Sequence, residues 1–135
     1  MTILTFDNPD TAPAPAGPYS NVARIDLRGT TLLVLAGQIA LDDEGNLVGE
    51  GDIAAQSRQI FDNIGALLAA HDATFGDIVN IRTFLTDINL IPEYGAVRKT
   101  YLTGPLPTST TVEVSKLFRP EALLEVEVMA AVQQP

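Results

Sequence analysis

The chain of 135 residues contains no cysteine and a single histidine, His71. The absence of cysteine excludes disulfides, thiolate nucleophiles and cysteine-ligated metal sites. One histidine cannot build a multi-histidine metal cage within one chain, because such a cage needs several imidazole ligands. We therefore expect no bound metal and no other cofactor.

Basic residues are also scarce: 8 Lys and Arg stand against 17 Asp and Glu, a formal net charge of −9. A surface that follows a nucleic-acid backbone needs cations to displace the counterions of the phosphates. This charge balance therefore argues against nucleic acid as a partner.

Long apolar segments are missing, since the longest run, Thr31 to Ala36, is far below the ~18 residues of a membrane span. Asp7 and Asp10 precede every Lys and Arg, which is the wrong charge pattern for a secretory signal. We expect a soluble, cytoplasmic protein without a membrane partner. The length and the 46% hydrophobic content predict one globular domain over residues 1–135.

The hydrophobic pattern predicts an α+β fold with about six strands and two helices. The strands are expected at 3–6, 22–27, 31–36, 77–86, 108–117 and 123–132, and the helices at 52–71 and 87–102. Ile53, Ile60, Phe61, Ile64, Leu67 and Leu68 form the apolar stripe of the first helix, with Gln56, Arg58, Gln59 and Asn63 opposite. Asp52 is a suitable N-cap for that helix. The four prolines between Pro9 and Pro18 predict an extended arm on the surface.

Two helices can cover only one face of such a sheet, so the side chains of the other face need an explanation. Strand alternation places Ser109, Thr111, Glu113, Glu125, Glu127 and Arg82 on this second face. These polar groups could simply be solvated. The strand Leu32 to Ala36, however, is apolar at every position, which favours a cover supplied by another subunit.

His71 is followed directly by Asp72, and this pair has two interpretations. The two side chains could form a catalytic dyad, or both could simply end the first helix, where an imidazole interacts well with terminal carbonyls. The local sequence places no nucleophile beside them, which favours the structural interpretation.

Seven short motifs occur in a fixed order along the chain. They are Gly17-Pro18-Tyr19, Ala36-Gly37-Gln38-Ile39, QSRQIFDN at 56–63, Gly76-Asp77-Ile78-Val79, Tyr101 before a Pro-rich turn, Thr111-Val112-Glu113-Val114 and Glu125-Val126-Glu127. In this order they resemble the Rid family of reactive-intermediate deaminases, also called YjgF or endoribonuclease L-PSP. The resemblance covers residues 15 to 132.

The resemblance implies a chorismate-mutase-like (bacillus type) fold, in which two helices cover one face of a mixed sheet of about six strands. It also implies a homotrimer whose sheets meet around a central barrel and whose clefts lie between subunits. The family's best-known activity is the hydrolysis of 2-imino or enamine acids to 2-keto acids and ammonia. There an arginine forks onto the substrate carboxylate and a glutamate near the end of the last strand holds or activates water.

The family's roles carry over unevenly. Tyr19 matches the tyrosine that lines the cleft, Gly37 the glycine at a strand end, and Glu125 the glutamate that handles water. Where the deaminases have Pro-x-Arg-Ser, this chain has Pro107-Thr108-Ser109-Thr110, so that Ser109 replaces the arginine.

Three further positions differ from the deaminase pattern. Ala36 stands where serine is usual, Arg98 where asparagine is frequent, and Thr111 where cysteine is frequent. Another cation could replace the missing arginine, and Arg82 is the first candidate, although it could instead merely neutralise the nearby glutamates. Arg24 and Arg98 are weaker candidates.

We therefore expect a hydrolase or deaminase that acts on an imine, an enamine or a related small metabolite, but not a standard 2-imino acid deaminase. Glu125, Ser109 and Tyr19 are the candidate catalytic residues. The candidate binding residues are Ala36, Gly37, Arg82, Arg98, Tyr101, Thr110 and Thr111. A trimer that binds a metabolite without turnover is the alternative. A ribonuclease or translation inhibitor is disfavoured, because a charge of −9 per chain opposes the approach of RNA.

Overall fold

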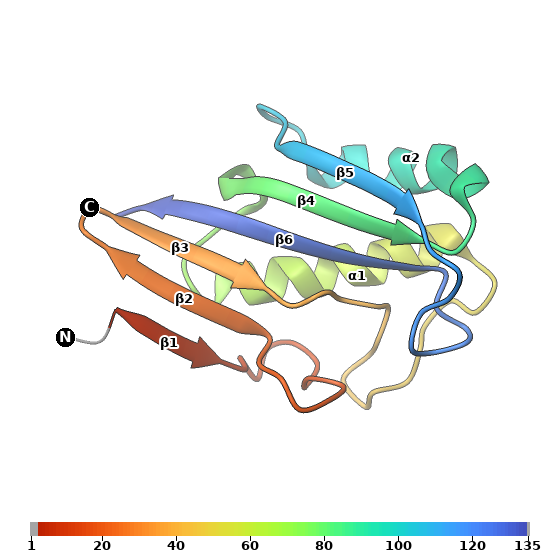
Figure 1. Ribbon diagram of the computed structural model, residues 1–135, viewed down its shortest axis with the longest axis horizontal. Coiled ribbons are helices and arrows are strands. Elements are labelled where there is room, and N and C mark those ends of the chain that lie inside the picture. The colour runs from red at the N-terminus through yellow and green to blue at the C-terminus, as the bar shows by residue number, and fades with distance from the viewer. Residues whose placement is uncertain (1–2, 135) are drawn as a thin grey trace.

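A six-stranded sheet with two α-helices on one face makes up the computed structural model, which describes residues 3–134 (Figure 1). Residues 1, 2 and 135 of the predicted domain lie outside this range. The strands are β1 (Leu4–Asp7), β2 (Val22–Leu27), β3 (Thr30–Leu35), β4 (Ile78–Leu85), β5 (Thr108–Glu113) and β6 (Leu124–Gln133). The helices are α1 (Ile53–Ala69) and α2 (Ile91–Tyr101), with short 3-10 turns at Phe75–Asp77 and Ile88–Leu90.

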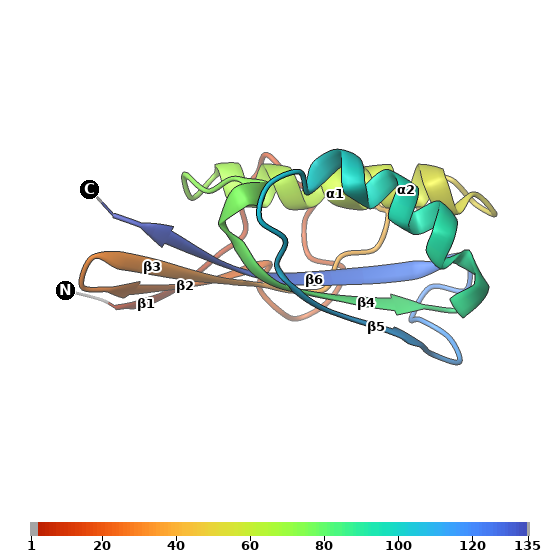
Figure 2. The ribbon, with the colours of Figure 1, turned by 90° about the horizontal axis from the view of Figure 1, so that it is seen from above.

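The strands are ordered β1-β2-β3-β6-β4-β5 across the sheet. All neighbours are antiparallel except β4 and β5, which are parallel and are connected through α2. A parallel pair needs such a crossover because its strands run in the same direction. Both helices lie on the same side of the sheet and leave the other side open (Figure 2). The predicted α+β fold, a mixed sheet with two helices on one face, is confirmed.

Helix α1 begins where its N-cap was predicted, because the side chain of Asp52 accepts a hydrogen bond from the backbone N–H of Ala55 at 3.0 Å. The predicted apolar stripe is buried along its full length. Gln56 and Asn63 were expected on the polar side, and that prediction is wrong. Both are buried, and Gln56 satisfies its amide by bonding to backbone groups of Gly49, Glu121 and Leu123.

Strand β4 starts with a β-bulge, a register shift between Ile78 and Asn80. Simple alternation along the predicted strand 77–86 would place Val79 on the helix side with Ile81, but Val79 is 43% exposed while Ile78 is 5% exposed. The extra residue of the bulge exchanges the two faces at this end of the strand. Beyond the bulge the predicted alternation holds, and Arg82 lies on the open face.

Strand β5 lies at the edge of the sheet, and its register corrects another prediction. Ser109 pairs with Ile81 and Thr111 with Thr83, and both partners are fully buried beneath the helices. The side chains of two residues that pair across neighbouring strands point to the same face of the sheet. Ser109, Thr111 and likewise Glu113 therefore lie on the helix side of the sheet, not on the open face where they were expected.

The open face carries apolar side chains that nothing covers within residues 3–134. In β3, Leu33 and Leu35 are buried against the helices while Val34, between them, points outward and is 36% exposed. Leu4 and Phe6 of β1 and Val112 of β5 are also exposed. Among the described residues, no helix is long and apolar enough to cross a membrane.

Candidate functional site

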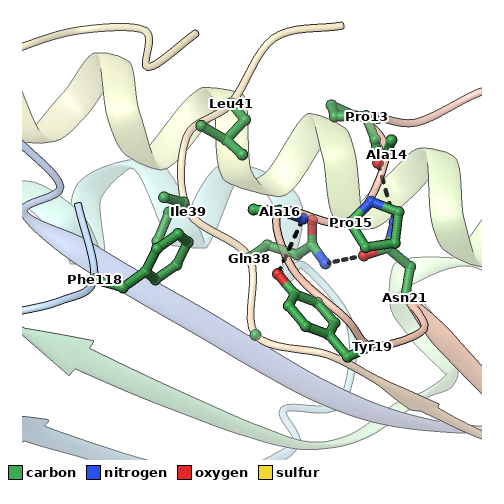
Figure 3. A pocket seen from close by; sticks show the side chains of 11 residues that line it. Pro13, Ala14, Pro15, Ala16, Tyr19, Asn21, Gln38, Ile39, Leu41 and Phe118 are labelled. Atoms are coloured by element: carbon green, nitrogen blue, oxygen red, sulfur yellow. Dashed lines mark hydrogen bonds between the residues drawn. The ribbon is translucent and has the colours of Figure 1, made fainter. Parts of the chain in front are cut away.

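The Pro-rich arm folds back toward the end of β3 and fixes the position of Tyr19 (Figure 3). The amide of Asn21 donates to the carbonyl of Pro13 at 3.0 Å, and the amide of Gln38 donates to the Asn21 side chain at 3.2 Å. The backbone N–H of Ala16 donates to the Tyr19 hydroxyl at 3.3 Å. These bonds keep the Tyr19 ring beside the segment that follows β3.

Tyr19, Ala36, Gly37 and Glu125 line one hollow of about 280 Å³ together with Phe118. The structure thus brings together four of the predicted site residues, and we call this space the Glu125 hollow. Phe118 was missed by the sequence analysis. Phe118 lies in the loop before β6 and is exposed. Because it belongs to no strand, the alternation of apolar and polar residues could not indicate its position.

Backbone pairing fixes the contact between Gly37 and Glu125. Gln38 and Val126 exchange two backbone hydrogen bonds, of 2.8 Å and 3.0 Å, which extend the sheet beyond the end of β3. In this antiparallel pair Gly37 and Glu125 are diagonal neighbours on the open face, and the Glu125 side chain extends over Gly37. A Cβ at Gly37 would overlap the Glu125 carboxyl group, so the side chain keeps its present position only because residue 37 is glycine.

The electrostatics of the Glu125 hollow favour a carboxyl group that can hold a proton. Burial raises the pKa of Glu125 above its usual range, and the charge of Glu127 raises it further. Arg82 lies nearby on the open face, but its Nε is 3.5 Å from the carboxylate of Glu127. A partly buried carboxyl group with a raised pKa can exchange protons with a bound water or substrate in the hollow that it shares with Tyr19.

A second hollow, of about 270 Å³, lies on the helix side, between α2 and the edge strand β5. Its lining includes Tyr94, Arg98, Lys99, Leu102, Leu106 and Thr111, and we call it the Arg98 hollow. Ser109 lies two residues before Thr111, on the same face of β5. Arg98, Ser109 and Thr111 are thus near one another, but the sheet separates them from Glu125 within one chain.

Four predicted site residues line neither hollow: Ser109, Arg82, Thr110 and Tyr101. Thr110 is exposed on the open face, where it pairs with Arg82. Tyr101 lies in the helix layer, where its hydroxyl donates to Asp62 at 2.8 Å. Burial, followed by the hydrogen bond to Asp62, raises the pKa of Tyr101 to about 12, so this hydroxyl stays protonated.

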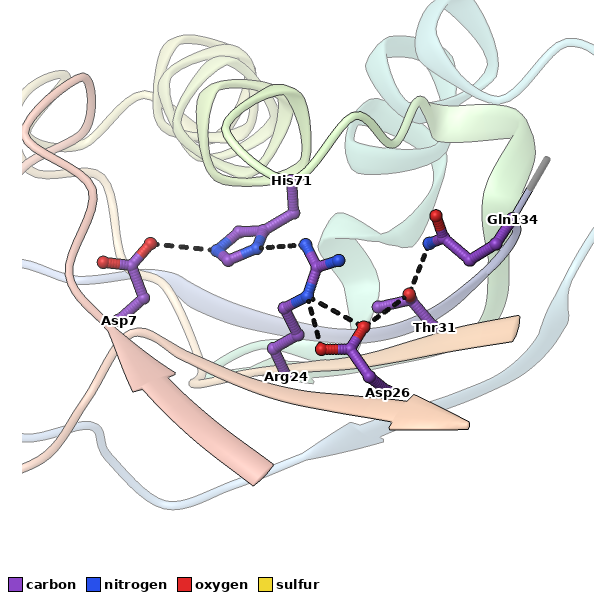
Figure 4. Close-up of polar contacts among 6 residues, drawn as sticks. All are labelled: Asp7, Arg24, Asp26, Thr31, His71 and Gln134. Carbon is purple, nitrogen blue, oxygen red and sulfur yellow. Dashed lines mark hydrogen bonds and ion pairs between the residues drawn. The ribbon is translucent and has the colours of Figure 1, made fainter. Parts of the chain in front are cut away.

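His71 bonds to strands β1 and β2 rather than to Asp72 (Figure 4). Its Nε2 is 3.0 Å from the carboxylate of Asp7, and its Nδ1 is 3.2 Å from Nη1 of Arg24. The Nε of Arg24 also donates a hydrogen bond to Asp26. A guanidinium can only donate, so Nδ1 accepts and Nε2 carries the proton. His71 thus connects the end of α1 to the sheet, and Arg24 is engaged in the same network. Among residues 3–134, no group of three or more His, Cys, Asp or Glu side chains could hold a metal ion.

A model of the family described as Endoribonuclease L-PSP matches residues 9–132. The chain belongs to the Rid (YjgF/L-PSP) family. The match spans nearly the whole domain, including both hollows, so the resemblance found in the sequence motifs is confirmed.

Relatives of this Rid protein cover almost its whole length. A RutC family protein of Sulfurisphaera tokodaii is 37% identical over 120 residues, which are 89% of this chain and 92% of that protein. A 2-iminobutanoate/2-iminopropanoate deaminase of Mus musculus is 31% identical over 92% of this chain and 87% of its own. The crystal structure of the Rid family protein YyfA from Yersinia pestis, a protein of unknown function, superposes with a TM-score of 0.85 at 36% identity, covering 96% and 99% of the two chains.

Proposed function

We propose that this Rid protein hydrolyses an imine or an enamine of a small metabolite, with Glu125 as the residue that handles water. The observation that carries the proposal is the Glu125 hollow, in which a carboxyl group with a raised pKa lies against a glycine and shares the space with a tyrosine. The name of the mouse relative, a 2-iminobutanoate/2-iminopropanoate deaminase, supports the same class of reaction.

The proposed reaction adds water across a C=N bond. Glu125 accepts a proton from water while the water oxygen bonds to the imine carbon and the C=N electrons move to nitrogen, which takes up a proton. The resulting carbinolamine then loses ammonia and leaves a ketone. Tyr19 is suited to donate to the substrate, because its hydroxyl oxygen accepts from the N–H of Ala16 and its own proton remains available.

The proposal includes a homotrimer. Glu125 lies on the open face, whereas Ser109 and Thr111 lie on the helix side, so one chain cannot bring these predicted site residues together. A cleft between subunits would join the Glu125 hollow of one copy to the β5 edge of the next. The uncovered apolar side chains of the open face, such as Val34 and Phe6, favour a second copy as their cover.

The test is the release of ammonia from 2-iminobutanoate and other imino acids that are generated enzymatically in the assay. Glu125→Gln keeps the size of the side chain but removes the base, and we expect the catalysed rate to fall about 10²- to 10⁴-fold. Glu50→Gln, at an exposed position away from the hollow, is the matched control and should keep the full rate. A wild-type rate equal to the spontaneous rate for every substrate would refute the proposal.

Metabolite binding without turnover is the second candidate, and the replacement at Ser109 favours it. Without an arginine on β5, the family's usual carboxylate fork is lost at that position. If the wild-type and Glu125→Gln proteins both match the spontaneous rate while a small carboxylate still raises the melting temperature, this second function is correct. A ribonuclease role remains disfavoured, since the chain carries a net charge of −9.

A further inference from the structure

We infer that Arg98 binds the anionic group of the substrate, so that the guanidinium missing from β5 is supplied from helix α2. This inference rests on the proposed function, because it assigns the other half of the same cleft. It also names the substrate class: a small carboxylic acid with a short apolar body.

The charge of the Arg98 hollow is the first argument. Arg98 and Lys99 both line it and no Asp or Glu does, in a chain whose net charge is −9. Arg24 and Arg82 each contact a carboxylate, at 3.1 Å and 3.5 Å, whereas no carboxylate of residues 3–134 lies within ion-pair distance of Arg98. A cationic hollow on an acidic protein attracts a small anion.

The second argument is that Arg98 is held in place from the buried core. Its Nη1 donates to the hydroxyl of Tyr94 at 3.3 Å, and that hydroxyl is hydrogen-bonded at 2.5 Å to Thr83 of β4. Tyr94 is 2% exposed, and the guanidinium carbon lies 5.9 Å from the centre of its ring. Only one of the five guanidinium N–H groups is used in this way. The others remain available for a two-point contact with a carboxylate, at a reduced entropic cost of ordering.

The third argument comes from the neighbours of Arg98. Thr111 brings a hydroxyl into the hollow, and Ser109 lies on the same face of β5. Leu102 and Leu106 supply apolar surface, and Leu106 is largely exposed. A carboxylate on Arg98 with an aliphatic chain against these leucines satisfies both kinds of surface. The loss of arginine at position 109 is therefore compatible with an acid as substrate.

Binding of 2-oxobutanoate, a stable acid of this class, tests the inference by isothermal titration calorimetry. Arg98→Gln should raise the Kd about 10- to 100-fold, because a charge-assisted contact is lost. Arg98→Lys keeps the positive charge but cannot make a two-point contact with a carboxylate, so its Kd should lie between those of the wild type and Arg98→Gln. Arg58→Gln, at an exposed position on α1, is the matched control and should bind as the wild type does. Circular dichroism melting establishes that each variant is folded.

A rescue variant separates a binding role from a structural one. In the double variant Arg98→Gln/Ser109→Arg the guanidinium returns from β5, and the Kd should recover most of the loss. The inference is overturned if the wild type does not bind 2-oxobutanoate, if Arg98→Gln binds as tightly as the wild type, or if the second substitution restores nothing.

Glu125→Gln, measured in the same titration, makes the two proposals distinguishable. It should bind 2-oxobutanoate with the wild-type Kd to within about threefold while its turnover is lost. Intact binding through Arg98 without any turnover in the wild type would refute the proposed hydrolysis and leave the role of Arg98 standing. Turnover that depends on Glu125 but not on Arg98 would refute the role of Arg98 and leave the proposed hydrolysis standing.

Discussion

The two hollows are nearly equal in size, about 280 Å³ and about 270 Å³, but opposite in character. The Glu125 hollow is on the open face and carries a carboxyl group whose pKa is raised by burial and by Glu127. The Arg98 hollow is on the helix side and carries two cations. Because the sheet lies between them, Arg98 cannot neutralise Glu125 within one chain. Each group therefore keeps its own charge properties, as the proposed cleft between subunits requires.

The two groups are also positioned by different means. A pair of backbone hydrogen bonds and a glycine place Glu125, whereas a row of side-chain contacts from Thr83 through Tyr94 places Arg98. Backbone pairing is insensitive to most substitutions, but an atom added at Gly37 must displace the Glu125 carboxyl group. The first prediction uses this difference.

Among variants that leave Glu125 itself unchanged, Gly37→Ala should give the largest effect on turnover. The added methyl group overlaps the Glu125 carboxyl group and forces it out of its present position. We expect ammonia release to fall about 100-fold, the scale that follows when a reacting group is displaced by about 1 Å. Gly104→Ala, where an added Cβ meets no atom within 4 Å, is the control and should keep the full rate. Equal rates in both variants would mean that the position of Glu125 does not matter.

Val34→Lys should disrupt the proposed contact between copies of the chain, which a cleft shared by the two hollows requires. The wild type should give a mass of about 43 kDa in light scattering, three times the 14.4 kDa of the chain. A lysine in the middle of the open face should shift the mass toward that of the single chain, since a buried unpaired charge costs several kcal/mol. Ala69→Lys, exposed at the end of α1, should leave the mass unchanged. A wild-type mass of 14.4 kDa would remove the basis for a shared cleft.

Much of this architecture could be predicted from the sequence, because the buried positions of α1, β3 and β6 give a clear spacing of apolar residues. The Asp52 cap, the apolar stripe of α1 and the alternation of Val126 and Val128 with Glu125 and Glu127 are all as predicted. These elements each have one face in the core, and core packing tolerates few polar residues.

Apart from the burial of Gln56 and Asn63 in α1, the errors occurred where that pattern is weak. The bulge at Val79 exchanges two apolar residues, Ile78 and Val79, so the composition of β4 gives no sign of it. In β5 most side chains are exposed, and hydroxyl residues are compatible with either face. The prediction that Ser109 lies on the same face of the sheet as Glu125 was wrong for that reason.

Glu127→Gln should give the smallest effect on turnover, and it tests how the charge of Glu127 acts on Glu125. Glu125 must lose its proton to act as a base, so the rate falls as the pH drops through its pKa. The charge of Glu127 raises that pKa, and its removal should move the acid limb of the pH–rate profile to lower pH. A limb that stays in place or moves upward would contradict the assignment of the limb to Glu125.

The same raised pKa affects stability with the opposite sign. The folded chain holds the proton of Glu125 more tightly than the unfolded chain does. The stabilisation from this bound proton is therefore fully present below the ordinary carboxyl pKa of 4.5 and is lost as the pH rises through the pKa of the folded state. A pH series of melting temperatures on the wild type and Glu127→Gln would show the two effects separately.

The run of four hydroxyl residues in β5, Thr108 to Thr111, has a consequence for how this edge can change. Sliding a strand by one position normally swaps its inner and outer side chains and ruins the match with its neighbour. Here a one-residue insertion or deletion in the loop before β5 would exchange Ser109 and Thr111 for Thr108 and Thr110, and an OH group would still point toward α2. The edge can thus absorb a length change in its connecting loop without losing its polar lining.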